Sequence, residues 1–107
     1  MKVSNTTPDN WTPLGADGSP AYDQFELLGH FLTTGTAQPN DTTFSGANDI
    51  VTGSYISTSG TKFGLSALVV PNGAPSSQDL WLKLKMPAKV ASPSQQHMTL
   101  TINGQAT

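Results

Sequence analysis

The sequence contains no cysteine and no arginine, and the missing cysteines exclude several kinds of protein. The chain has no disulfide framework, no thiolate nucleophile and no cysteine ligand for zinc. Its hydrophobic core and its hydrogen bonds must therefore hold the fold together.

Charge is also scarce, because five lysines and seven acidic residues make up only 11% of the 107 residues. A typical soluble domain has about 25% charged residues. With a formal net charge of −2, the chain lacks the basic surface that attracts nucleic acid, and we predict no nucleic-acid partner. No apolar run approaches the roughly 20 residues of a membrane-spanning helix, so no membrane span is predicted.

In their place are 25 serine and threonine residues, ten glycines and eight prolines, a composition typical of strands joined by turns. The length matches one domain, residues 1–107. Low charge and abundant hydroxyl groups favour an exported protein, so we predict an extracellular or cell-surface location. Residues 1–8 contain no apolar signal-peptide stretch. Two explanations are open, a chain that is cytoplasmic as made and a segment whose export signal lies outside it, and the second is favoured.

Hydrophobic residues alternate with polar ones in several stretches, which predicts strands, and no stretch has the spacing of an amphipathic helix. The predicted strands cover residues 22–33, 50–57, 62–70, 80–86 and 98–102. The first of these strands is expected to be largely buried. One of its faces is formed by Phe25, Leu27, Gly29 and Phe31.

Residues 80–86 show the clearest alternation in the sequence. The row predicted to point inward consists of Leu80, Leu82, Leu84 and Met86. The row predicted to point outward consists of Trp81, Lys83 and Lys85.

These five strands, with a fragment at residues 2–4, are fewer than the about seven strands of a complete two-sheet sandwich. A sheet that lacks a strand exposes a row of unpaired N–H and C=O groups, and such an edge pairs with another chain. We therefore predict an all-β, antiparallel sandwich with an open assembly edge. The residues of this predicted edge are Lys2, Val3, Ser4, Met98, Thr99, Leu100, Thr101 and Ile102.

Several landmarks follow one another in a suggestive order. Asn5 and Trp11 lie in a polar turn, Asp23-Gln24-Phe25-Glu26-Leu27 opens a strand, Phe63 is in mid-chain, and Leu80-Trp81-Leu82-Lys83-Leu84 precedes Pro87 and the strand at 98–102. From Val3 to Ile102 this pattern resembles the immunoglobulin-like β-sandwich domains of secreted and surface-attached bacterial proteins, including repeat and filament-forming subunits. The resemblance implies one or two further strands before Val3, and so a sandwich that lacks a strand.

No arrangement of residues predicts catalysis. His30 and His97 are not spaced as metal ligands, and no G-x-S-x-G or S-x-x-K motif is present. The turn at residues 15–18 lacks the lysine of a phosphate-binding loop. We predict a protein that is not an enzyme, with no catalytic residues and no cofactor.

Two loops are rich in the carboxylate and amide oxygens that Ca²⁺ prefers. The candidate carboxylates are Asp9, Asp17, Asp23, Asp41 and Asp49. Their spacing does not match an EF-hand, and aspartate also stabilises turns by bonding to its own backbone. Turn formation is the favoured interpretation, and calcium binding is the alternative.

Trp11, Trp81 and Tyr55 are candidates for a ligand platform, because sugar-binding sandwiches stack sugar rings on exposed aromatic side chains. The alternative is that the tryptophans pack in the core.

The predicted function is a non-enzymatic extracellular subunit, structural or adhesive, that associates with itself or with adjacent β-domains by strand addition. Such a subunit would form a filament, a surface layer or a surface repeat. A carbohydrate-binding module that holds a glycan is the first alternative, and a viral decoration or fibre protein is the second.

Overall fold

The computed structural model describes residues 1–57, 62–64, 77–91 and 93–103, and these contain strands and two short 3-10 helices but no α-helix. The strands are β1 (Lys2–Val3), β2 (Thr12–Pro13), β3 (Gln24–Thr33), β4 (Ile50–Val51), β5 (Gln78–Lys85) and β6 (Leu100–Thr101). The 3-10 helices are η1 (Asp41–Thr43) and η2 (Lys62–Gly64). The all-β prediction is confirmed. Neither short helix in the described ranges is long and apolar enough to cross a membrane.

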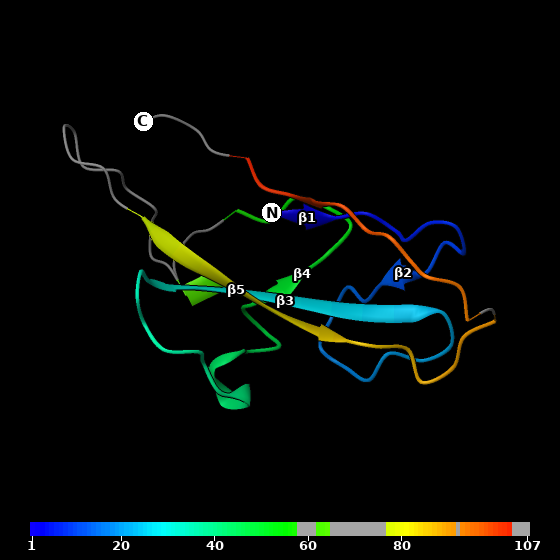
Figure 1. The fold of residues 1–107 in the computed structure, drawn as a ribbon, viewed down its shortest axis with the longest axis horizontal. Helices are drawn as coiled ribbons and strands as arrows, with labels where there is room; N and C mark the ends of the chain where they lie inside the picture. The colour runs from blue at the N-terminus through cyan, green and yellow to red at the C-terminus, as the bar shows by residue number, and fades with distance from the viewer. Residues whose placement is uncertain (58–61, 65–76, 92, 104–107) are drawn as a thin grey trace.

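Strand β3 is the centre of the larger sheet (Figure 1). On one side, β5 runs antiparallel to it over eight residue pairs, which begin at Glu26 opposite Lys85 and end at Thr33 opposite Gln78. On the other side, β2 pairs in parallel with the start of β3, and β4 pairs antiparallel with its middle. The sheet is therefore mixed, and the prediction of a wholly antiparallel fold is wrong at β2. Strands β1 and β6 form a second, two-stranded antiparallel sheet.

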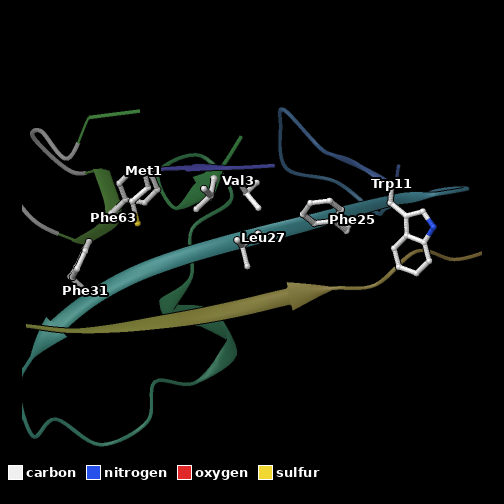
Figure 2. Packing of buried hydrophobic residues seen from close by; sticks show 8 residues of the cluster. Met1, Val3, Trp11, Phe25, Leu27, Phe31 and Phe63 are labelled. Carbon is white, nitrogen blue, oxygen red and sulfur yellow. The ribbon is translucent and has the colours of Figure 1, made fainter. Parts of the chain in front are cut away.

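One hydrophobic core receives side chains from both sheets, and Figure 2 shows it gathered along β3. Its buried members are Met1, Val3, Trp11, Phe25, Leu27, Phe31, Val51 and Phe63, with Met98 and Leu100 packed against them. The predicted strand at 22–33 and its apolar face are thus confirmed. Gly29 continues this face, and a Cβ there would lie 3.3 Å from the Met1 methyl carbon, so the glycine lets Met1 pack closely on β3.

Two of the other predicted strands differ from the prediction in the residues that the structure describes. The strand predicted at 50–57 ends after Val51, and the Thr52 hydroxyl then accepts a hydrogen bond from the Ser54 N–H in a bend. The strand predicted at 62–70 begins instead as η2, and residues 65–70 lie outside the described residues.

Phe63 explains why the chain turns at η2. Its backbone has a φ of 59°, a left-handed conformation that costs an L-residue about 1–2 kcal/mol. Its side chain is completely buried, which stabilises the fold by roughly 1.5–3 kcal/mol. Burial of the ring therefore offsets the backbone cost.

Replacing Phe25 with alanine tests the core. Phe25 is 0% exposed, so Phe25→Ala should lower the free energy of unfolding by about 3–5 kcal/mol in urea denaturation. The control is Tyr22→Ala, because Tyr22 is 57% exposed and its loss should change stability by less than about 0.5 kcal/mol. Equal effects of the two substitutions would contradict the described core.

Candidate functional site

The leucine row of β5 lies on the core face of the sheet, as predicted, because Leu80, Leu82 and Leu84 are opposite Phe31, Gly29 and Leu27 of β3. The two faces are covered to a different extent than predicted. Leu82, Leu84 and Met86, expected to point inward, are 49%, 44% and 59% exposed. Trp81, Lys83 and Lys85, expected to point outward, are all partly buried. The alternation and its two faces are therefore as predicted, but the leucine row beyond Leu80 is half exposed and the lysine row is half covered.

Acidic residues from distant loops explain this difference. The Lys83 ammonium lies 2.7 Å from the Asp41 carboxylate of η1. The Lys85 ammonium lies 2.8 Å from Glu26 Oε1 on β3 and 3.2 Å from Asp17 Oδ1. The lysine-bearing face of β5 is therefore covered by the segments that carry these acidic residues. The leucine row, in contrast, extends beyond the described core.

Glu26 is the most enclosed charged residue among the described positions. Its side chain is 0% exposed, and its second carboxylate oxygen accepts a hydrogen bond from the Gly18 N–H at 3.0 Å. The hydrogen bond to Glu26 raises the pKa of Lys85 above its ordinary value, with a smaller contribution from Asp17, although partial burial acts in the opposite direction. The raised pKa favours the protonated form of Lys85, which is the form that pairs with Glu26 and Asp17.

The hydrogen bonds of β3 determine which backbone groups of β5 are free. Phe25 C=O accepts from Leu14 N–H, and Gly29 N–H donates to Asp49 C=O, so the odd-numbered residues of β3 face β2 and β4. Because successive residues of a strand point their N–H and C=O groups to opposite sides, the even-numbered residues of β3 face β5. Their partners on β5 are Asp79, Trp81, Lys83 and Lys85. The N–H and C=O groups of Gln78, Leu80, Leu82 and Leu84 therefore point away from β3, where no described strand pairs with them.

We call these four residues the open edge of β5. Sequence reasoning did not identify this edge, because the alternation in residues 80–86 shows that neighbours point to opposite faces but not which side of the strand is paired. The signal that was present is the length of the strand, since eight residues make it the longest described strand after β3.

The two segments predicted as an assembly edge lie side by side and bond to each other. Lys2 is opposite Thr101, Val3 is opposite Leu100, and Ser4 N–H donates to Thr99 C=O at 2.9 Å. The other side of β1 is also bonded, because Val3 N–H donates to Thr52 C=O at 2.9 Å. Lys2, Val3 and Ser4 are therefore an interior strand, and the prediction of an open edge at these residues is corrected.

The outer side of the last strand is the part of that predicted edge that has no described strand beside it. Thr99 and Thr101 face β1, so the N–H and C=O groups of Met98, Leu100 and Ile102 point outward. The paired stretch has only two residues, and Met98 and Leu100 direct their side chains into the core. This is a shorter edge than the one on β5.

His30, which is partly buried, and the buried Asp49 form a second polar pair on the lysine-bearing face. Asp49 is 1% exposed, and its Oδ2 lies 2.9 Å from His30 Nδ1 and accepts the Ser45 N–H at 2.8 Å. A general base would need its free nitrogen near a nucleophile, but a Cβ at Gly64 would lie only 2.5 Å from His30 Nε2. The Gly64 backbone therefore covers that nitrogen, and the pair anchors the loop at residues 44–49 to β3. His97 lies elsewhere, bridged to Thr7.

The three candidate platform residues do not share a surface suited to a sugar. Trp11 is 6% exposed and packs in the core, which corrects its assignment as a platform. Trp81 is partly buried on the lysine-bearing face, opposite His30. Tyr55 is 51% exposed, but the Lys2 ammonium sits over its ring at 4.6 Å from the ring centre.

The five carboxylates considered for calcium have separate partners. Asp9 accepts from Gln96 Nε2 and Asp23 from Ala91 N–H, while Asp17, Asp41 and Asp49 pair as described above. Within the ranges that the structure describes, no group of three histidine or acidic side chains could hold a metal ion. Four of these carboxylates thus bind residues distant in sequence, and only Asp49 also accepts a hydrogen bond from a nearby backbone N–H, that of Ser45.

Comparison with known protein families, with curated proteins and with solved structures finds no match to this chain. The functional assignment therefore depends on the geometry of the chain itself.

Lys85→Met should lower the free energy of unfolding by about 3 kcal/mol, because it leaves the Glu26 carboxylate buried without its charge partner. Adding Glu26→Leu should restore much of this loss, since removing both members of a buried pair is often neutral. Urea denaturation of both variants measures the difference. Lys89→Met is the matched control at an exposed lysine. An equal loss of unfolding free energy in this variant would show that the Glu26–Lys85 pair does not stabilise the fold.

The raised pKa of Lys85 also sets a direction for the pH dependence. Since the folded pKa lies above the ordinary value of 10.5, the stabilisation from the pair is complete below that pH and is lost as pH rises through the folded pKa. Between about pH 9 and about pH 12, the urea midpoint of the natural protein should fall more than that of the Glu26→Leu/Lys85→Met variant. Parallel curves for the two proteins would exclude this contribution.

Proposed function

We propose that this protein is a non-enzymatic structural subunit that associates by strand addition at the open edge of β5. The observation that carries this proposal is the coincidence of two features on one strand. The outward N–H and C=O groups of Gln78, Leu80, Leu82 and Leu84 have no described partner strand, and Leu82 and Leu84 are also about half exposed. Hydrogen-bonding capacity and apolar surface together are what an added strand uses.

The charges of β5 support the same role. Natural proteins guard open edges with lysine side chains that would be buried unpaired by a neighbouring strand. The two lysines of β5 are instead neutralised within the chain, Lys83 by Asp41 and Lys85 by Glu26 and Asp17. Asp79, the other charged residue of β5, accepts the Gly35 N–H and has no ion pair among the described residues. The lysines of the strand therefore leave no free positive charge to oppose an incoming strand.

The expected affinity is modest and depends on the leucines. Three residue pairs that each exchange two hydrogen bonds contribute about 6 kcal/mol at roughly 1 kcal/mol per bond. This lies within the range of about 4–15 kcal/mol that association costs in lost freedom. Each half-exposed leucine that becomes covered adds about 1 kcal/mol, so the apolar row decides whether the complex forms.

The architecture that we propose is an immunoglobulin-like sandwich that lacks one strand. Two sheets that share one core support this proposal. The proposed location outside the cell is supported by composition, namely the low charge, the absence of arginine and the many hydroxyl residues. The absence of catalytic chemistry is supported by the charged state of Lys85 and by the Gly64 backbone against His30 Nε2.

Leu82→Lys tests the proposed edge. If two copies meet at β5, the substitution removes one leucine contact from each copy, together worth about 2 kcal/mol. The dissociation constant should therefore become roughly 30-fold larger. Sedimentation equilibrium over a concentration series measures this constant.

The matched control is Ile102→Lys, a substitution of another half-exposed aliphatic residue, which lies beside β6. This variant should associate like the natural protein. If Ile102→Lys weakens association and Leu82→Lys does not, β6 is the contact and the proposed edge is wrong. A natural protein that stays monomeric at every concentration contradicts the function itself.

A further inference from the structure

We propose that the strand added at β5 is β5 of a second copy of this chain, paired antiparallel about a two-fold axis at Leu82. This inference rests on the strand addition proposed above, and it adds the identity of the partner and the register of the contact. Homo-oligomers most often use such a two-fold contact, in which the same patch on both subunits is self-complementary.

Backbone geometry restricts the registers that are available. An antiparallel pair exchanges hydrogen bonds between residues whose N–H and C=O groups both face the gap. On β5 the even-numbered residues face outward, as the hydrogen bonds of β3 show. Even-numbered residues must therefore lie opposite even-numbered residues, and the remaining registers differ only in the residue on the two-fold axis.

The axis at Leu82 matches every leucine with a leucine. Leu82 then lies opposite the partner's Leu82, and Leu80 lies opposite the partner's Leu84. Directly opposite side chains in an antiparallel pair share a face of the sheet. The leucine rows of the two strands therefore join into one apolar strip, and each leucine gains a neighbour on the side that is now open.

The same register is complementary in charge on the other face. Asp79 lies opposite the partner's Lys85, and Lys83 lies opposite the partner's Trp81. Opposite charges across a strand pair are favourable, and a lysine beside an indole ring is also favourable. No like charges lie directly opposite each other in this arrangement.

The neighbouring registers are less suitable. An axis at Lys83 would place Lys83 opposite the partner's Lys83, and an axis at Leu84 would place Lys83 opposite the partner's Lys85. Like charges directly opposite are destabilising. An axis at Trp81 avoids this repulsion but leaves Leu84 opposite the partner's Gln78.

A single engineered cysteine tests the register, because the natural chain has no thiol. Hydrogen-bonded antiparallel pairs have a Cα separation of about 5.5 Å, which is within the range that a disulfide needs. Leu82→Cys should therefore form a disulfide-linked dimer on mild oxidation. With the thiols held at millimolar effective concentration, the dimer should form about 1,000-fold faster than by random collision at micromolar protein.

Leu84→Cys is the matched control, because it changes an equally exposed leucine on the same face. In the proposed register its thiol lies four residues along the strand from the partner's equivalent thiol, so this variant alone should stay unlinked. A mixture of Leu80→Cys and Leu84→Cys chains should instead form the mixed dimer. Melting curves check that each variant is folded.

The outcomes separate the partner and register from the function. If the natural protein associates but Leu82→Cys links no faster than Leu84→Cys, this register is wrong while strand addition stands. If the natural protein does not associate at all, both proposals are wrong. Occupation of the edge by residues 65–70 of the same chain would give a monomer in which all three thiols stay free, and would overturn the inference.

Discussion

The antiparallel ladder between β3 and β5 is the constraint on which the rest of the described structure depends. It fixes the eight cross-strand pairs, and so it decides which side chains of β5 lie on each face. It also decides which backbone groups are used, because β3 has partners on both sides whereas β5 has a described partner on one side only. The open edge follows from this ladder rather than from any single residue.

The few charges of the chain have a place in the same scheme. Lys83 and Lys85 are drawn to Asp41, Glu26 and Asp17 on one face, and Asp49 holds His30 there. These contacts tie the loops around residues 17 and 41–49 to the sheet. A chain with only 11% charged residues that uses both lysines of its long edge strand internally has little charge left to keep other strands away.

Local patterns predicted the existence of the long strands well. The alternation of Phe25, Leu27 and Phe31 identified β3 and its buried face, because large apolar side chains on one face of a strand are stable only when that face is buried. The coverage of the two faces of β5 was not predictable in this way, since it depends on Asp17 and Asp41, which are distant in sequence. The parallel pairing of β2, the left-handed turn at Phe63 and the pairing of β1 with β6 likewise arise from contacts between distant segments.

Amide hydrogen exchange along β5, measured at low and at high protein concentration, tests the central claim most directly. In the dilute protein, the amides of Trp81, Lys83 and Lys85 should be protected by β3, whereas those of Leu80, Leu82 and Leu84 should exchange rapidly. At high concentration these three leucine amides should become protected as well. Leucine amides that are already protected in the dilute protein, or that stay unprotected at every concentration, would contradict the account.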